Sequence, residues 1–297
     1  MDRVLEYEIP SEYDGANITT VLKQHFKIST NLIKDLKKYK EGIQVNGEHK
    51  RVVDLAAKGD ILKITIRDTV SENIVPTDIP LDIVYEDEDV LVINKPPNMP
   101  THPSMGNYEN SLANGVMYYY KSKGEERVFR AVNRLDKDTS GLMAVAKNSY
   151  IHARLGEEIQ KKELKRKYMC IVCGDVTSDG TVDAPIRRAD GSVINRIVAP
   201  DGQRAVTHYR VIKRYREYTL LEMELETGRT HQIRVHMAYI GHPLVGDWLY
   251  GTEDHNIAKR QMLHSCYLCF THPITGQIME FKDEMAEDMR AFIEKLS

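Results

Sequence analysis

The stretch Asn133-Arg134-Leu135-Asp136-Lys137-Asp138-Thr139-Ser140-Gly141 is the part of the chain that decides its fold. It joins an apolar approach, residues 130–132, to an apolar exit, residues 142–146. Thr, Ser and Gly near its end are residue types that favour a tight turn. We therefore predict that Asp136 lies at the mouth of a β-sheet, with a turn over residues 139–141.

A second stretch, Thr227-Gly228-Arg229-Thr230-His231-Gln232-Ile233-Arg234-Val235-His236, lies far along the chain. The two stretches together closely resemble the signature of the RluA-type pseudouridine synthases, which isomerise uridine in ribosomal or transfer RNA. A third string, residues 241–251, matches the same family. This family is therefore the leading hypothesis.

The resemblance implies an isomerase that needs no cofactor. Converting uridine to pseudouridine breaks the bond from the sugar to a base nitrogen, turns the base and joins the sugar to a ring carbon. Because nothing is oxidised, added or lost, we expect no redox cofactor and no metal. Large-subunit ribosomal RNA is the expected substrate, and transfer RNA is the alternative.

The family's essential Asp falls on Asp136, which we expect to act as nucleophile or general base. Whether it attacks the sugar, attacks the base or only stabilises charge is left open. A carboxylate among apolar residues favours its neutral form, so an enzyme that needs the charge must supply a cation. The resemblance assigns this task to Arg234, beside the apolar stripe of a helix expected over residues 230–240.

Three further residues receive roles from the resemblance. Arg134 is expected to fill the space left when the target nucleotide flips out of its stack. Tyr168 is expected to stack on the extruded base or to remove a sugar proton, and Leu244 to form an apolar wall of the uracil pocket. A plain core position is the alternative for Tyr168 and Leu244. The chain departs from the family at Asn133, where His is usual, and we expect this change to modulate activity.

Residues 1–67 resemble a second known unit. The spacing of apolar residues predicts two short helices, over residues 18–26 and 32–39, and residues 43–48 alternate into an Asn-Gly turn that is typical of a hairpin. Two basic helices followed by a hairpin resemble the alpha-L RNA-binding module. The Lys residues that we expect to face phosphate are Lys34, Lys37, Lys38 and Lys40.

The charge of the chain is segregated. The whole chain carries a net charge of -3, yet residues 15–67 contain eleven Lys or Arg against five Asp or Glu. Residues 68–91 then hold eight acidic residues and no basic one. Since polyanion binding depends on local patches rather than on the charge of the whole chain, we expect RNA as the partner. A merely solvated basic face is the alternative.

The expected domains are an alpha-L RNA-binding domain at residues 1–67, a linker at 68–80 and a catalytic domain at 81–297. In the catalytic part, strands are predicted at residues 83–85, 90–94, 167–172, 205–212 and 218–225, with helices that begin at the caps Ser149 and Thr230. Few segments alternate as βαβ units. We therefore predict an α+β fold with a mixed, mostly antiparallel central sheet, flanking helices and a small N-terminal α+β domain.

Two CxxC pairs, at residues 170–173 and 266–269, form the skeleton of a four-Cys zinc site. Both lie in apolar, strand-like runs, where residues three apart point to opposite faces, so we favour free thiols. His231 and His236 are five residues apart and lack a Glu partner, which argues against a metalloprotease. No metal site is expected.

Two other functions fit the sequence less well than the isomerase. Glycoside hydrolysis would require a second catalytic carboxylate across the cleft, and the sequence offers no paired motif for one. A non-catalytic RNA-binding factor in ribosome assembly would be favoured if Asp136 or Arg234 were absent, but both are present.

The bulk properties are those of a globular protein. The chain has 297 residues, of which 41% are hydrophobic and 29% charged, and its mean hydropathy is -0.45. No apolar run reaches the roughly 20 residues that a membrane span requires. We therefore expect a cytoplasmic protein without a membrane partner. A monomer is expected as well.

Overall fold

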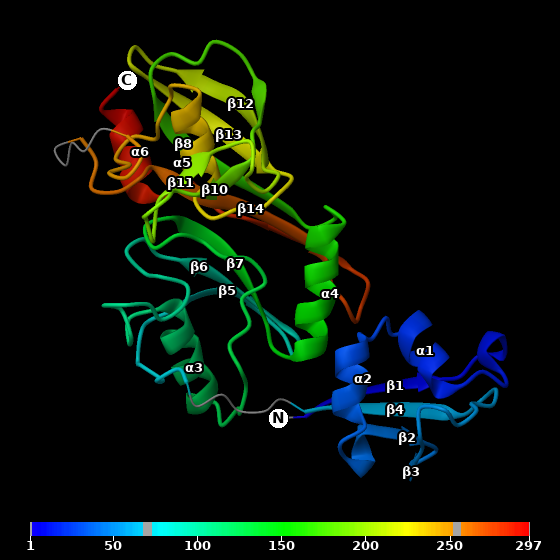
Figure 1. Ribbon diagram of the computed structural model, residues 1–297. Coiled ribbons are helices and arrows are strands. Elements are labelled where there is room, and N and C mark those ends of the chain that lie inside the picture. Colours follow the sequence, from blue (N-terminus) through cyan, green and yellow to red (C-terminus); the bar gives the residue numbers. More distant parts are fainter. Residues whose placement is uncertain (1, 68–72, 252–256, 297) are drawn as a thin grey trace.

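The computed structural model of the protein describes residues 2–67, 73–251 and 257–296 and places them around two β-sheets (Figure 1). A four-stranded sheet lies near the N-terminus, and a nine-stranded sheet forms the body of the molecule. A separate two-stranded hairpin lies within the later part of the chain. In the described ranges no helix is both long and apolar enough to cross a membrane.

The N-terminal module, residues 2–67, combines the sheet β1-β4-β2-β3 with two short helices. Its elements are β1 (Arg3–Glu8), α1 (Ile18–Gln24), α2 (Thr30–Leu36), β2 (Ile43–Val45), β3 (Glu48–His49) and β4 (Ile61–Ile66). The predicted hairpin is confirmed: Asn46 and Gly47 have φ angles of 52° and 83°, which is the left-handed backbone that an Asn-Gly turn needs. β1 was not predicted, and it pairs antiparallel with β4.

The large sheet has the order β5-β6-β7-β14-β8-β13-β12-β9, with β15 paired to β14. Among the described strands only β7 and β14 pair in parallel, so the predicted α+β fold with a mixed, mostly antiparallel sheet is confirmed. The strands are β5 (Asp82–Glu86), β6 (Val90–Lys95), β7 (Ser140–Ala146), β8 (Lys165–Cys173), β9 (Gly180–Asp183), β12 (Val206–Arg214), β13 (Tyr218–Leu225), β14 (Leu263–Thr271) and β15 (Ile278–Lys282). The separate hairpin is β10 (Ile186–Arg188) and β11 (Arg196–Val198).

Strand β6 shows why the centre of the large sheet is apolar throughout. Val90 and Val92 pack into one core cluster with residues of α4, whereas Leu91 and Ile93 pack into another with residues of α3 and α5. Both faces of the strand are therefore buried, and an unbroken apolar run is what such a strand requires. The helices are α3 (Leu112–Ser122), α4 (Ser149–Gln160), α5 (Gln232–Tyr239) and α6 (Glu287–Glu294).

Two predicted helix caps lie one residue away from their expected positions. Asn148, not Ser149, is the N-cap of α4: its backbone is extended and its side chain accepts the N–H of Ile151. His231, not Thr230, is the N-cap of α5, with a left-handed φ of 58° and no side-chain cap. Its ring forms a hydrogen bond with the Tyr250 hydroxyl instead, at 2.8 Å.

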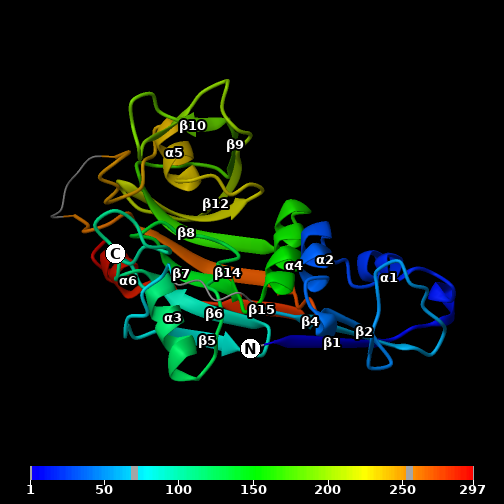
Figure 2. The same cartoon turned by 60° about the horizontal axis from the view of Figure 1, so that its bottom comes forward.

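The N-terminal module packs against α4, and both views show α2 beside that helix (Figures 1 and 2). Arg3 forms a two-pronged ion pair with the buried carboxylate of Asp89 at 2.8 Å for each bond. The Tyr150 hydroxyl donates to the Phe26 carbonyl at 2.9 Å. Part of the predicted linker, residues 68–72, lies outside the described residues, and residues 73–80 contain no helix or strand.

Candidate active site

A cleft of about 780 Å³ opens beside the large sheet, between the start of β7, the end of α4 and the loop that leads from β13 into α5. Four of the predicted site residues line it: Arg134, Asp136, Tyr168 and Arg234. Segments far apart in the sequence therefore meet in one cavity.

Asp136 lies in a turn that leads into β7. The Thr139 N–H donates to the Asp136 carbonyl at 3.1 Å and closes the turn. The turn predicted over residues 139–141 was wrong, because Ser140 and Gly141 already belong to β7. Gly141 has a φ of 109°, and a Cβ there would lie 2.2 Å from the Ser265 carbonyl oxygen. Only glycine permits this close approach of β14 behind the turn.

Lys95 supports the turn that carries Asp136 by binding its backbone. Its side chain is fully buried, and its ammonium donates to the carbonyls of Pro96, Met99 and Lys137 at 2.8, 2.8 and 3.0 Å. Burial lowers the pKa of Lys95 to about 7, against the raising effect of Asp138 and Asp136. The three bonds tie the β6–α3 loop to the turn that carries the carboxylate, so the turn is fixed before any substrate binds.

Arg234 reaches Asp136 from α5. Its Nη1 lies 3.2 Å from Asp136 Oδ2, within the separation expected of an ion pair. The Arg234 side chain is 5% exposed and that of Asp136 is 24% exposed. The guanidinium is thus inside the protein, whereas the carboxylate still opens into the cleft.

Asp247 is the residue that sequence reasoning missed. Its fully buried carboxylate accepts from Arg234 Nε at 2.7 Å and from Nη2 at 2.8 Å, which leaves Nη1 for Asp136. Burial alone would lower the pKa of Arg234, but the two carboxylates outweigh burial and raise the pKa above its usual range. The arginine is therefore charged at every working pH, and Asp247 fixes its direction.

His231 is the second basic group near Asp136, with its Nε2 3.9 Å from Asp136 Oδ2. Burial lowers the pKa of His231, although the charge of Asp136 opposes that effect. The ring is therefore mainly neutral near neutral pH. Arg234 is then the lasting positive charge beside Asp136.

The other predicted residues lie at different depths. Tyr168 is 4% exposed on β8, and burial raises its pKa, so its hydroxyl keeps its proton at neutral pH. Arg134 is exposed at the rim. Leu244 is not brought to the cleft: it is 1% exposed in the core. Among the described residues that line the cleft, Leu263 and Ile233 are apolar residues that can serve as its wall.

Asn133, where the chain departs from the family pattern, is buried. Its side-chain Oδ1 accepts the N–H of Ala144 at 2.9 Å and ties the segment before Asp136 to β7. The Asn133 side chain therefore stabilises the segment before Asp136. An amide suits this hydrogen bond because its oxygen is an acceptor at every pH.

The four predicted lysines lie on the N-terminal module. Lys34 is on α2, Lys37 and Lys38 follow it, and Lys40 is in a short 3₁₀ turn; all four are exposed. Lys38 pairs with Asp35 at 2.6 Å. They do not line the cleft, but α2 lies beside α4, whose far end reaches the cleft wall (Figure 1).

The four cysteines are free thiols on neighbouring strands, two on β8 and two on β14. Burial raises the pKa of Cys170 above its usual range and that of Cys266 to about 11. Within the described ranges no group of three or more His, Cys, Asp or Glu side chains is arranged to hold a metal ion.

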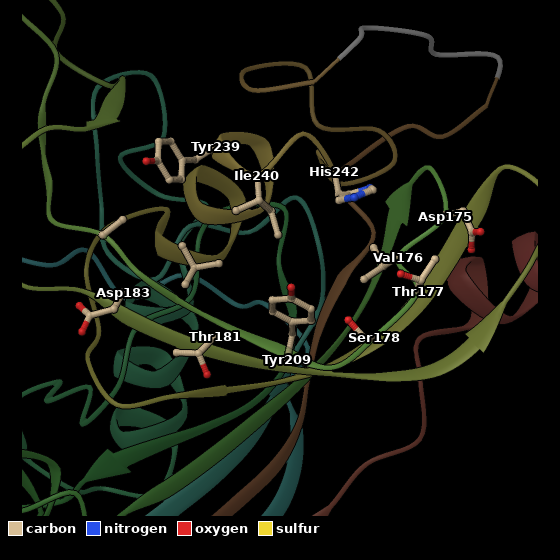
Figure 3. Close-up of a pocket in the computed structure, with 12 residues that line it drawn as sticks. Asp175, Val176, Thr177, Ser178, Thr181, Asp183, Tyr209, Tyr239, Ile240 and His242 are labelled. Atoms are coloured by element: carbon tan, nitrogen blue, oxygen red, sulfur yellow. The ribbon is translucent and has the colours of Figure 1, made fainter.

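A second pocket, of about 420 Å³, lies near the end of α5 and is shown in Figure 3. Tyr209, Ile240 and His242 line it together with Asp175 and Asp183, and no Lys or Arg stands among its described lining residues. Its acidic character makes it a poor place for a polyanion. The cleft around Asp136, with its several cations, is the better candidate.

A family model described as RNA pseudouridylate synthase matches residues 89–239, a span that includes Asp136, Tyr168 and Arg234. The chain belongs to this family. It is an RNA pseudouridine synthase and so an isomerase, as the two sequence stretches predicted.

Curated relatives support the same assignment over most of the chain. An uncharacterized RNA pseudouridine synthase, YjbO, from Bacillus subtilis is 45% identical over 268 residues, which is 90% of this chain and 94% of that protein. Ribosomal large subunit pseudouridine synthase D from Pasteurella multocida is 41% identical over 251 residues, covering 80% and 78%. The protein of that name from Escherichia coli K12 is 45% identical over 232 residues, covering 74% and 71%.

Two solved structures share the fold. Human RNA pseudouridylate synthase domain containing 4 superposes with a TM-score of 0.59 at 22% identity, covering 72% of this chain and 92% of that one. The human domain containing 1 protein gives a TM-score of 0.57 at 22% identity, covering 74% and 96%.

Proposed function

We propose that this enzyme isomerises uridines of large-subunit ribosomal RNA and that Asp136 is its catalytic residue. The observation that carries the catalytic assignment is the pairing of Asp136 with the buried Arg234 at the mouth of the cleft. The proposed substrate is supported by the relatives that are named large-subunit synthases. We propose that the protein works as a monomer in the cytoplasm.

The arrangement suits an isomerisation in which no atom is gained or lost. The bond from the sugar to N1 of the base breaks, the sugar joins C5, and the proton from C5 ends on N1. Arg234 places a positive charge 3.2 Å from the Asp136 carboxylate, which can attack or stabilise the electron-poor carbon of the sugar or the base. Asp247 fixes the orientation of the Arg234 side chain, so the guanidinium is already positioned beside Asp136 when substrate binds.

Tyr168 and Arg134 are proposed to handle the base. Tyr168 stands in the wall of the cleft, where its ring can stack on an extruded base while its hydroxyl keeps its proton. Arg134 is exposed at the rim, where it can occupy the gap that the extruded nucleotide leaves in the RNA. The freed base must be retained between the two bond changes, and the apolar side chains of Ile233 and Leu263 in the cleft lining can hold it.

Mapping pseudouridines in total RNA from cells with and without this protein tests the proposed function. We expect specific positions of large-subunit ribosomal RNA to lose the modification in its absence and to regain it when the gene is restored. If only transfer RNA loses pseudouridine, the substrate is transfer RNA and not large-subunit ribosomal RNA. If cells without the protein assemble ribosomes poorly but keep every pseudouridine, and the Asp136→Asn protein corrects the assembly defect, the non-catalytic alternative would be favoured.

The lysines on and after α2 are proposed to contact phosphate. Replacing Lys34 and Lys37 by Gln should weaken RNA binding and reduce the slope of log Kd against log salt by roughly 0.7 to 0.9 for each phosphate that is no longer bound. Lys121→Gln, which removes an exposed charge at the end of α3, is the control. Binding measured across a salt series decides the matter, and an unchanged slope in the double variant would mean that this face does not contact RNA.

A further inference from the structure

We propose that Arg166 is an anchor for one phosphate of the bound RNA in the wall of the cleft. The inference rests on the proposed function, because it takes RNA as the ligand. It adds a binding residue that neither the catalytic pair nor the lysines of the N-terminal module supply.

Arg166 is a buried cation in the wall of the cleft. It is 8% exposed, yet it lines the cleft, and its buried Nε has no hydrogen-bond partner in the described part of the chain. Among the described residues no carboxylate forms an ion pair with it. A buried guanidinium without an anion is energetically unfavourable. We therefore infer that a bound ligand supplies the anion.

The alternation of β8 directs Arg166 into the site. Residues two apart on a strand share a face, so Arg166 and Tyr168 lie on the same side of β8. Lys167, between them, lies on the opposite face and pairs with Glu222 at 3.2 Å. The guanidinium of Arg166 lies beside Gly228, where an added Cβ would be 3.5 Å from its Nη1. The charge is thus next to the loop that leads into the helix of Arg234.

Two neighbouring cations share one carboxylate. Lys162 and Arg204 both form ion pairs with Glu226 Oε2, and His208 Nε2 lies 2.9 Å from its Oε1. The hydrogen bonds from Lys162, His208 and Arg204 lower the pKa of Glu226 to about 2, so this carboxylate is charged. Glu226 thus pairs with two cations, Lys162 and Arg204, while none of the described carboxylates pairs with Arg166. The wall keeps an excess of positive charge beside this guanidinium, and that combination selects an anion.

A phosphodiester is the anion that an RNA cleft meets. A guanidinium presents parallel N–H groups that match two phosphate oxygens, and it binds them more strongly than the neutral carbonyl of a base. Arg166 would therefore hold the backbone of the target nucleotide, or of its neighbour, while Tyr168 on the same face meets the base. Arg166 and Tyr168 would together determine how deeply the target nucleotide enters the cleft.

The test measures binding of a short single-stranded oligouridine RNA across a salt series. Arg166→Gln should weaken binding at low salt and reduce the slope of log Kd against log salt by about 0.7, which is the value for one phosphate contact with a single strand. Arg166→Lys should restore most of the slope, because it keeps the charge. Lys167→Gln is the matched control: it removes a charge from the adjacent residue, outside the cleft, and should leave the slope as in the wild type.

Thermal unfolding separates this role from a structural one. Because no described carboxylate is left unpaired when Arg166 is removed, Arg166→Gln should leave the melting temperature unchanged or raise it. A lower melting temperature together with an unchanged salt slope would make Arg166 a structural residue and overturn the proposal. If the wild type itself binds RNA without salt dependence and forms no pseudouridine, the proposed function fails. If the wild type binds and Arg166→Gln matches it, only this inference fails.

Discussion

The Asp136→Asn protein is expected to form no measurable pseudouridine, below about 1% of the wild-type rate, while its RNA affinity stays within a few-fold. The amide keeps the shape of the side chain but cannot act as an ionised nucleophile or base. It can still accept a hydrogen bond from Arg234 Nη1, so the fold and the RNA contacts should survive. The measurement is pseudouridine formed in large-subunit ribosomal RNA by the purified protein, with binding assayed in parallel.

Asp138 provides the control for this substitution. It lies two residues further along in the same stretch, and its backbone carbonyl, not its carboxylate, accepts from Arg260 Nη1 at 3.0 Å. Asp138→Asn should therefore retain most of the activity. An Asp136→Asn protein that turns over at more than a few per cent of the wild-type rate would remove Asp136 from the mechanism.

The proposed catalytic pair could be predicted from sequence because each member lies in a short stretch of residues that resembles the family's signature. Asp136 and Arg234 are 98 residues apart, yet the structure gives them a contact of 3.2 Å. The Asn46-Gly47 hairpin was predictable for a local reason, since a two-residue turn depends on the residue types within it. Its φ angles follow directly from those two residues.

Features that depend on distant contacts were not predictable in the same way. Strand β1 is completed by β4, whose residues lie far along the chain, so the first residues alone do not reveal a partner. Asp247 is a turn Asp by its residue type and its preceding glycine, and only burial against Arg234 gives it another role. The one signal available was its place in the string of residues 241–251 that matches the family. Leu244, in that same string, is buried in the core instead.

Replacing Arg234 by Met should have the second large effect, on both stability and activity. The substitution leaves the fully buried carboxylate of Asp247 without its partner. Removing one member of a buried pair typically costs about 3–5 kcal/mol of unfolding free energy. Denaturant unfolding should show this loss, and Asp247→Leu combined with Arg234→Met should recover part of it because no charge is then buried.

The pH dependence of the Arg234→Met protein separates catalysis from stability. Without the guanidinium, Asp136 loses its nearest lasting cation, since His231 is mainly neutral near neutral pH. Losing this positive charge beside the reacting carboxylate should move the acid limb of the rate profile to higher pH. Activity that is missing near neutrality should partly return in base, as long as the protein is shown to be folded there.

Arg234→Lys sets the scale for this change. Lysine keeps a positive charge near Asp136 but cannot contact Asp247 with two parallel N–H groups and Asp136 with a third. It should therefore retain more activity than Met and show a smaller shift of the acid limb, while its rate at the optimum stays below that of the wild type. If the Met protein, folded at the assay temperature, had the wild-type pH profile, the charge of Arg234 would not act on Asp136 during the reaction. The role of Arg234 would then be confined to the buried contact with Asp247.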